Sequence, residues 1–302
     1  MTVAPYCGRF APSPTGPLHF GSLVAAIGSC LEARVRGGRW LLRMDDLDRP
    51  RCSRAAADEI LRALEAYGFQ WDGEVVWQSG RDAAYREALG RLKAEGRVFP
   101  CACTRRELAD SALAPDGATI YPGTCREGLP PGREGRAWRM RVDGAHVAVD
   151  DLIQGWIDSD LGREAGDFVL QRADGLFAYQ LAVVVDDADA GVTDIVRGAD
   201  LLASTARQIF VRRCLGLPEP RHAHLPAAVN AAGEKLSKQT RADPLDCSNP
   251  VPALVAALRF LGQAIPVALE RETLPAVWQW ALANWSLAAV PQRRTLTYNP
   301  PV

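Results

Sequence analysis

Two motifs that lie far apart in the chain constrain its fold more than any other feature. Residues 9–22 have the sequence RFAPSPTGPLHFGS, and residues 235–239 have the sequence KLSKQ. Three prolines exclude a helix from most of the first motif, and Gly16 permits a tight turn, so this stretch predicts a rigid loop that ends at His19. A helix is expected to begin near Gly21, and its start presents unpaired backbone amides that suit phosphate.

The second motif places Lys235 and Lys238 on either side of Ser237, in a loop that Gly233 introduces. Two lysines at this spacing suit a clamp that neutralises charge on a leaving pyrophosphate. Taken singly, the first motif is equally typical of an ordinary turn, and the second of a solvated surface. Their order and separation favour the two halves of one ATP site.

Composition indicates a compact enzyme. With 302 residues, 48% of them hydrophobic, the chain has enough material for one catalytic body and a small appendage. No stretch reaches the length of a membrane span and the N-terminus lacks a signal-peptide pattern, so we expect a cytoplasmic protein without a membrane partner. Eight cysteines in such a chain predict thiols or metal ligands, and no structural disulfides.

Overall charge gives weak evidence against a nucleic-acid partner, because the formal net charge is −1. A local basic patch would remove this objection. Five arginines cluster in one segment, and they form either such a patch or a solvated loop face. They are Arg126, Arg133, Arg136, Arg139 and Arg141.

Apolar periodicity predicts alternating strands and helices, and therefore an α/β fold with a parallel sheet. Between 99 and 135 the pattern gives way to proline, glycine and arginine with paired cysteines, which indicates an insertion. The period of 177–187 does not separate a buried strand from a buried helix. Expected strands are 6–10, 39–44, 193–197 and 223–229, and expected helices are 21–36, 55–67, 81–95, 202–215, 250–261 and 276–289.

The two motifs, together with residues 43–51 (RMDDLDRPR) and 196–202 (VRGADLL), resemble the class I aminoacyl-tRNA synthetases and, more narrowly, their glutamyl members. The resemblance runs from Cys7 to about Gln239. It implies a Rossmann-like catalytic domain over 1–245, with a zinc-bearing insertion at about 98–140, and a helical stem-contact-like tail over 246–302. For the run 177–187 it implies a strand that turns into a short helix.

The length of the chain indicates which branch of this family it resembles. About sixty residues follow Lys238, too few for an anticodon-binding domain as well as the stem-contact region. The chain therefore resembles the short paralogues of the glutamyl enzymes. This resemblance implies a monomer that activates L-glutamate with ATP and Mg²⁺ to glutamyl-adenylate without tRNA, and then transfers glutamate to the queuosine base at the wobble position of tRNA(Asp). The alternatives are a truncated enzyme that charges a tRNA 3′ end, and a catalytically silent glutamate- or ATP-binding module.

The resemblance also implies the site residues. His19, Lys235 and Lys238 are expected to be catalytic. The ATP-binding set adds Gly21, Ser22, Leu236, Ser237 and Gln239, where Ser22, Leu236 and Gln239 depart from the general signatures. Arginine suits the glutamate side chain because its planar fork holds a carboxylate bidentately. The glutamate-binding set is Arg9, Phe10, Ala11, Pro12, Ser13, Asp45, Tyr179 and Arg197.

Asp45 occupies the position of an acid that receives the substrate ammonium group, where the subfamily has glutamate. A carboxylate one methylene shorter must approach closer or act through water. Its neighbours Asp46 and Asp48 are the alternatives.

Cys101, Cys103 and Cys125 have the clustered thiolates of a small structural zinc site. The residues alone leave the fourth ligand open among His146, Asp116 and water, while the family pattern indicates Tyr121. Buried or oxidised thiols are the alternative to zinc.

Two further groups carry weaker signals. Asp186, Asp187 and Asp189 suggest either a magnesium site or an acidic turn that caps the next element. His222 and His224 flank a short strand, where His224 either approaches the adenine or packs in the interior.

Overall fold

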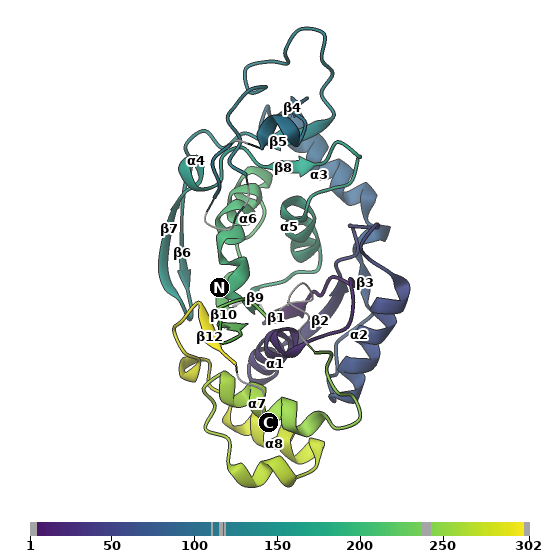
Figure 1. The fold of residues 1–302 in the computed structure, drawn as a ribbon, viewed down its shortest axis with the longest axis vertical. Helices are drawn as coiled ribbons and strands as arrows, with labels where there is room; N and C mark the ends of the chain where they lie inside the picture. The colour runs from purple at the N-terminus through teal and green to yellow at the C-terminus, as the bar shows by residue number, and fades with distance from the viewer. Residues whose placement is uncertain (1–4, 110, 115–116, 118, 237–242, 299–302) are drawn as a thin grey trace.

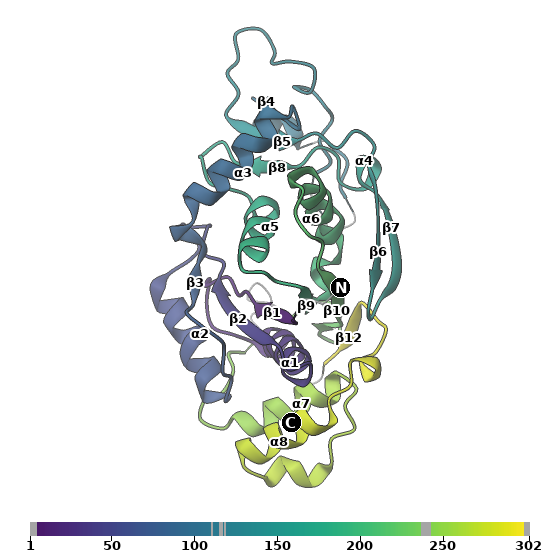
Figure 2. The same ribbon diagram turned by 180° about the vertical axis from the view of Figure 1, so that it is seen from behind.

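The computed structural model describes residues 5–109, 111–114, 117, 119–236 and 243–298. The molecule is elongated, with parallel strands in the middle, α7 and α8 at one end and β4 and β5 near the other (Figure 1). The view from behind shows the same arrangement (Figure 2). The first half contains β1 (Cys7–Phe10), α1 (Phe20–Val35), β2 (Arg39–Met44), α2 (Arg54–Ala66), β3 (Val76–Trp77) and α3 (Asp82–Ala94).

The second half begins beyond the insertion. The insertion and the hairpin that follows it contain β4 (Val98–Cys101), β5 (Ala137–Met140), β6 (His146–Asp151), β7 (Gly155–Asp160) and α4 (Leu161–Glu164). The remaining elements are β8 (Val169–Gln171), α5 (Tyr179–Asp189), β9 (Asp194–Gly198), α6 (Leu202–Leu215), β10 (Arg221–Leu225), β11 (Ala227–Val229), α7 (Pro250–Phe260), α8 (Leu274–Asn284) and β12 (Thr295–Thr297).

The parallel strands of the two halves lie side by side. Strand β2 pairs in parallel with β1 and β3, and β10 pairs in parallel with β9 and β6. The halves join where the Thr193 amide donates to the Cys7 carbonyl (2.9 Å) and the Cys7 amide donates to Thr193 Oγ1 (2.8 Å). The prediction of an α/β fold with parallel strands is confirmed.

Helix α1 lies very close to the sheet. A Cβ atom built on Gly28 would come within 2.5 Å of Leu225 Cδ1, so any larger residue would require the buried Leu225 side chain to move. The apolar face expected for the helix is confirmed, because Leu23, Ile27 and Leu31 are all fully buried. The position of α1 over β10 fixes where the helix begins relative to the ends of the strands.

The C-terminal helices share the apolar core of the first half. Trp278 Nε1 donates to the Tyr67 carbonyl and Trp285 Nε1 donates to Glu32 Oε2, both at 2.8 Å. Buried residues of α7 and α8, such as Leu258, belong to the same cluster as α1. The predicted helical tail is therefore packed against α1 and the end of α2.

Several segments differ from the sequence prediction. The run 177–187 forms helix α5, and the strand expected in its first part is wrong; Phe177 makes a single bridge with Gln171. The strand expected at 223–229 is divided into β10 and β11, because Pro226 between them has no amide to donate. The β6–β7 hairpin was not predicted from the sequence.

A buried ionic cluster ties β1 and β2 to α5. Arg43 Nη1 donates to Asp187 Oδ1 (2.5 Å), and Arg9 Nε donates to the same oxygen (3.2 Å). Burial by itself would raise the pKa of Asp187, but the two arginines lower it to about 2. Burial would likewise lower the pKa of Arg43, but Asp45 and Asp187 raise it well above its ordinary value. These groups are therefore charged in the folded protein.

The acidic residues of α5 lie in the last turns of that helix, and among the described residues they are not part of a metal-ligating cluster of three or more side chains. Asp186 accepts from Gln78 Nε2 (2.7 Å), Tyr85 Oη (2.9 Å) and Arg81 Nε (2.6 Å). Asp189 pairs with the same Arg81. The capping interpretation is wrong, because these aspartates lie within helix α5 and pair with arginines.

We expect Asp187→Ala to destabilise the fold by about 3–5 kcal/mol, because it leaves buried arginine charge without its carboxylate. Urea unfolding followed by circular dichroism measures this difference. Asp58→Ala is the control, since Asp58 pairs with Arg54 on the exposed surface, and we expect it to change the free energy of unfolding by less than about 0.5 kcal/mol. Equal effects of the two substitutions would contradict the role given to the buried cluster.

Candidate active site

A cavity of about 660 Å³ lies at the carboxyl ends of β1 and β9, beside the start of α1. Ligands of open α/β sheets bind in this position. Most of the predicted site residues line it, namely Arg9, Phe10, Ala11, Pro12, Ser13, His19, Gly21, Ser22, Tyr179, Arg197, Lys235 and Leu236. The structure thus brings both motifs to one cavity. Ser237, Lys238 and Gln239 lie outside the described residues.

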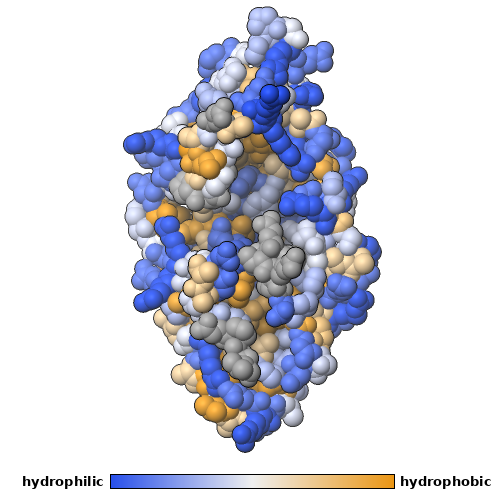
Figure 3. Space-filling view, viewed as in Figure 1, coloured by the Kyte–Doolittle hydropathy of each residue, from blue (hydrophilic) through white to orange (hydrophobic). Residues whose placement is uncertain are grey.

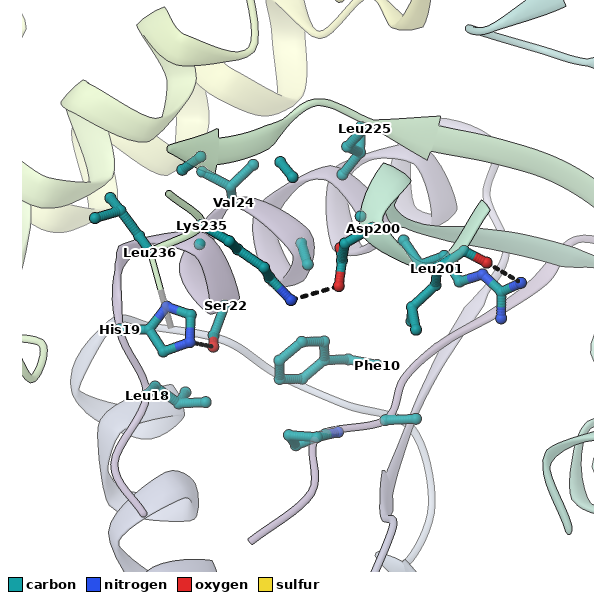
Figure 4. Close-up of a pocket in the computed structure, with 18 of the residues that line it drawn as sticks. Phe10, Leu18, His19, Ser22, Val24, Asp200, Leu201, Leu225, Lys235 and Leu236 are labelled. Atoms are coloured by element: carbon teal, nitrogen blue, oxygen red, sulfur yellow. Dashed lines mark hydrogen bonds and ion pairs between the residues drawn. The ribbon is translucent and has the colours of Figure 1, made fainter. Parts of the chain in front are cut away.

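One side of the cavity is formed by the beginning of α1 and the second motif. His19 is the N-cap of α1, and its Nε2 lies 3.3 Å from Ser22 Oγ. Lys235 reaches across to Asp200, so that His19, Ser22 and Lys235 surround one region (Figure 4). A helix start with a histidine and a lysine beside it is suited to bind an anion.

Gly21 lies between the two motifs, where space is limited. A Cβ atom at this position would lie 3.2 Å from His19 Cε1 and 3.5 Å from the Leu236 carbonyl oxygen. A side chain at this position would therefore require a small shift of the His19 ring. The prediction that Gly21 belongs to the site is consistent with this packing.

Arg197 supplies positive charge at the opposite side of the cavity. Its guanidinium is buried, and Nη1 donates to Tyr179 Oη (3.3 Å) while Nη2 donates to Thr205 Oγ1 (2.9 Å). Within the described part of the chain, Arg197 forms no ion pair with a carboxylate. Burial without a counter-ion lowers the pKa of Arg197. A ligand carboxylate would supply the missing negative charge.

Arg9 and Asp45 have a different environment. Arg9 lines the cavity, but its Nε and Nη2 atoms both donate to Asp187. Asp45 is buried and is not among the residues that line the cavity; it accepts from Arg43 Nε (2.7 Å). Its alternative Asp46 accepts from the amide and hydroxyl of Ser79. Arg197 therefore differs from Arg9 in having no carboxylate partner among the residues that the structure describes.

His224 and Asp151 were not predicted as a pair. His224 lies in the interior, as one of its two interpretations expected, and its ring contacts both Arg197 (3.0 Å) and Asp151 (2.6 Å). The sequence feature that could have drawn attention to His224 was its spacing from His222 along one strand. Nothing in the sequence indicated Asp151, because it lies 73 residues away from its partner.

The three cysteines converge in the insertion. Their sulfur atoms lie within 4.8 Å of one another. The Tyr121 hydroxyl lies 3.5 Å from Cys101 Sγ and 3.6 Å from Cys103 Sγ, so it occupies a fourth position beside the sulfurs. Of the other proposed ligands, His146 lies on β6 and faces Asp160 (3.9 Å), and Asp116 lies outside the described residues. This donor set fits a small tetrahedral metal site.

Most arginines of the insertion contact other groups of the protein, some of them outside the insertion. Arg126 contacts Asp167 (3.0 Å) and Arg133 contacts Glu107 (2.6 Å). Arg139 is buried, donates to Cys101 Sγ (3.3 Å) and covers the Tyr121 ring. Four of the five arginines of this segment therefore contact acidic groups or the sulfur cluster, and Arg136 is exposed. On the face seen in Figure 3, hydrophobic residues occur in small groups among hydrophilic ones.

Comparisons with known proteins identify the family. Residues 7–248 match the family model "tRNA synthetases class I (E and Q), catalytic domain". Glutamyl-Q tRNA(Asp) synthetase of Aromatoleum aromaticum is 62% identical over 96% of this chain and 91% of that protein. The enzyme of the same name from Dechloromonas aromatica is 61% identical over 96% and 97%. The chain belongs to the glutamyl-Q tRNA(Asp) synthetase family.

Solved structures confirm the class I synthetase fold. Glutamate-tRNA synthetase from Elizabethkingia anophelis has a TM-score of 0.80 and 22% identity, and covers 97% of this chain and 68% of that chain. Mycobacterium tuberculosis methionyl-tRNA synthetase has a TM-score of 0.57, with 15% identity over 86% of this chain and 64% of that chain. As a member of the glutamyl-Q tRNA(Asp) synthetase family, the chain is a ligase of the class I synthetase type. None of its described helices is long and apolar enough to cross a membrane.

Proposed function

We propose that this enzyme activates L-glutamate with ATP and Mg²⁺ in the absence of tRNA, and then transfers the glutamyl group to queuosine in the anticodon of tRNA(Asp). The observation that carries the proposal is the buried Arg197 guanidinium, which lines the cavity without a carboxylate partner in the described chain. Glutamate, whose side chain ends in a carboxylate, would provide that partner. The names and full-length coverage of the relatives support the acceptor.

Activation joins two anions. A glutamate α-carboxylate oxygen attacks the α-phosphorus of ATP, the bond to the β-phosphate breaks, and pyrophosphate leaves with the electron pair. We assign His19, Gly21 and Ser22 to the phosphates at the start of α1, and Lys235 to the charge on the leaving group. Mg²⁺ supplies further neutralisation of the phosphates when bound. Leu236, Ser237, Lys238 and Gln239 complete this ATP site in the proposal.

Glutamate binding uses the other side of the cavity. We assign the side-chain carboxylate to Arg197 and Tyr179, and residues 10–13 to the wall beside the substrate. Arg9 adds positive charge that Asp187 partly neutralises. Asp45 would receive the ammonium group through water, since its carboxylate faces Arg43.

Transfer completes the reaction. A queuosine hydroxyl attacks the carbonyl of glutamyl-adenylate, an ester bond forms, and AMP leaves.

We propose that residues 1–245 carry the catalysis and that residues 246–302 contact the tRNA. We also propose the cytosol as the compartment where the enzyme would meet a modified tRNA. The cavity lies beside helix α1 and strands β1 and β9. This position supports the assignment of catalysis to residues 1–245.

We expect Arg197→Ala to reduce glutamate-dependent ATP–pyrophosphate exchange by roughly 10²-fold or more, because a buried ion pair with substrate is lost. The Michaelis constant for ATP should change by less than about threefold. Arg197→Lys keeps the charge but removes the fork, and should also weaken glutamate binding. Unchanged exchange kinetics in both variants would refute the assignment of Arg197.

The acceptor is tested by transfer of radiolabelled glutamate to tRNA from cells with queuosine and from cells without it. We expect label on the modified tRNA alone, and we expect it to remain when the tRNA 3′ end is blocked. Equal labelling of both tRNAs, abolished by that block, would instead show an enzyme that charges the 3′ end. Absence of both labelling and pyrophosphate exchange would favour a silent binding module.

We also propose that Cys101, Cys103, Cys125 and Tyr121 bind a structural zinc ion. The three sulfur atoms lie within 4.8 Å of one another, and the Tyr121 hydroxyl lies 3.5 Å from Cys101 Sγ and 3.6 Å from Cys103 Sγ, as a small tetrahedral site requires. The ion would hold the two cysteine-bearing segments of the insertion together. Its role is therefore structural and remote from the proposed chemistry.

Cys103→Ser should lower both the zinc content and the thermal stability of the protein, because it removes one ligand. Zinc is measured by atomic absorption after extensive dialysis. Cys214→Ser serves as the control, since Cys214 is a half-buried thiol on α6, far along the chain from the cluster. Zinc content that is the same in all three proteins would refute the site.

A further inference from the structure

Arg197 is supported from the interior by a fully buried pair of side chains. His224 Nε2 lies 3.0 Å from Arg197 Nε, and His224 Nδ1 lies 2.6 Å from Asp151 Oδ2. The side chains of both His224 and Asp151 are 0% exposed. Asp151, His224 and Arg197 thus form a continuous chain of hydrogen bonds that ends at the cavity.

The hydrogen bonds determine which nitrogen of His224 carries the proton. A guanidinium nitrogen can only donate, so His224 Nε2 accepts from Arg197, and the Thr205 hydroxyl, 3.1 Å away, can donate to the same nitrogen. The proton therefore lies on Nδ1, where it is donated to Asp151. A second proton on Nε2 would face the Arg197 cation inside the protein, and burial lowers the pKa of His224. The ring is accordingly neutral, in the Nδ1–H form.

Asp151 is itself held rigidly. Its Oδ1 atom accepts from the backbone amides of Ile153 (3.1 Å), Gln154 (2.8 Å) and His224 (3.1 Å), while Oδ2 is left for the imidazole. Burial alone would raise the pKa of Asp151, but the hydrogen bond from His224 and these amides lower it. An ionised, immobile carboxylate fixes the tautomer and the orientation of the ring.

The arrangement orients Arg197 without neutralising it. A carboxylate placed directly on the guanidinium, as Asp187 is on Arg9, would compete with a carboxylate ligand. A neutral imidazole accepts one hydrogen bond and leaves the positive charge in place. Because Nε contacts His224, the Nη1 atom lies on the side of Tyr179, another residue that lines the cavity.

We propose that His224, oriented by Asp151, is a positioning residue that holds the Arg197 guanidinium in place for the side-chain carboxylate of the amino-acid substrate. This inference rests on the proposed function. It assigns to His224 a role in the affinity for glutamate and none in the binding of ATP, which lies at the start of α1.

Two amide substitutions test the contributions of the two imidazole nitrogen atoms separately. His224→Gln places an oxygen near the position of Nε2, where it can accept from Arg197, whereas His224→Asn keeps an amide near Nδ1 and leaves Arg197 Nε without an acceptor. We expect His224→Asn to raise the Michaelis constant for glutamate by about 10- to 100-fold, the loss typical of one hydrogen bond to a charged group. His224→Gln should recover a large part of this loss, and the constant for ATP should stay within about threefold in both.

His222→Gln is the matched control. His222 is also buried on β10, its ring stacks on that of His224 at 6.0 Å, and its nitrogen atoms have no hydrogen bond in the described structure. We expect its Michaelis constant for glutamate to stay within about threefold of the wild-type value. Equal increases for all three variants, with lower thermal stability, would show a general packing role and overturn the inference.

The tautomer provides a readout that does not depend on activity. A long-range ¹H–¹⁵N spectrum of the histidine rings should show one neutral Nδ1–H ring that disappears in His224→Gln. Asp151→Asn keeps the shape of Asp151, but its amide donates to Nδ1 and should move the proton to Nε2, where it opposes the N–H of Arg197. This variant should therefore also bind glutamate more weakly, by about 10-fold or more.

The outcomes distinguish this inference from the proposed function. Wild-type enzyme without glutamate-dependent pyrophosphate exchange would refute the proposed function, and the inference with it. Active wild-type enzyme with unchanged glutamate kinetics in both His224→Asn and Asp151→Asn would refute the positioning role alone. A wild-type spectrum in which the His224 ring is cationic, or carries its proton on Nε2, would also overturn the inference. If His224→Asn does not fold, the isosteric Asp151→Asn variant decides between these results.

Discussion

The geometry of the cavity depends on the buried ion pairs that Arg9 and Arg43 form with Asp187. Buried charges contribute less to stability than to specificity, because any other arrangement of the strands would leave them unpaired in the interior. Asp187 lies on α5, whereas both arginines lie on the first two strands. The cluster therefore fixes the two halves of the sheet relative to each other, and with them the start of α1 and the end of β9.

The two arginines that line the cavity, Arg9 and Arg197, have different roles because their surroundings differ. Arg9 shares its charge with Asp187, so its contribution to the cavity is partly cancelled. Arg197 has a histidine, a threonine and a tyrosine around it, and these neutral groups leave its charge available. Burial without a counter-ion costs free energy in the empty protein. A substrate carboxylate would recover that free energy, which is a physical basis for selecting an acidic amino acid.

The arginines of the insertion likewise interact mainly with other groups of the protein. Arg139 covers Tyr121 and contacts Cys101, and Arg126 and Arg133 pair with acidic neighbours. A segment with so many arginines looks basic in sequence, yet little of that charge is left for a polyanion. Arg139 instead lies against the sulfur cluster, where positive charge favours thiolates. Arg126 and Arg139 both contact Asp167, so the insertion is also tied to the segment that follows it.

The sequence alone determined the α/β class, the bounds of α1, β2 and α6 to within a residue or so, and the two motifs that meet at the cavity, because hydrophobic period and prolines act locally. It also determined the family, through the spacing of residues 9–22, 43–51 and 196–202. Only the tertiary structure decided that Asp187 neutralises Arg9, that Asp45 faces Arg43 and that Asp151 orients His224. These contacts join residues far apart in the chain, and a carboxylate's partner depends on which elements pack around it. For the same reason a buried apolar run, 177–187, was assigned to a helix only once its neighbours were known.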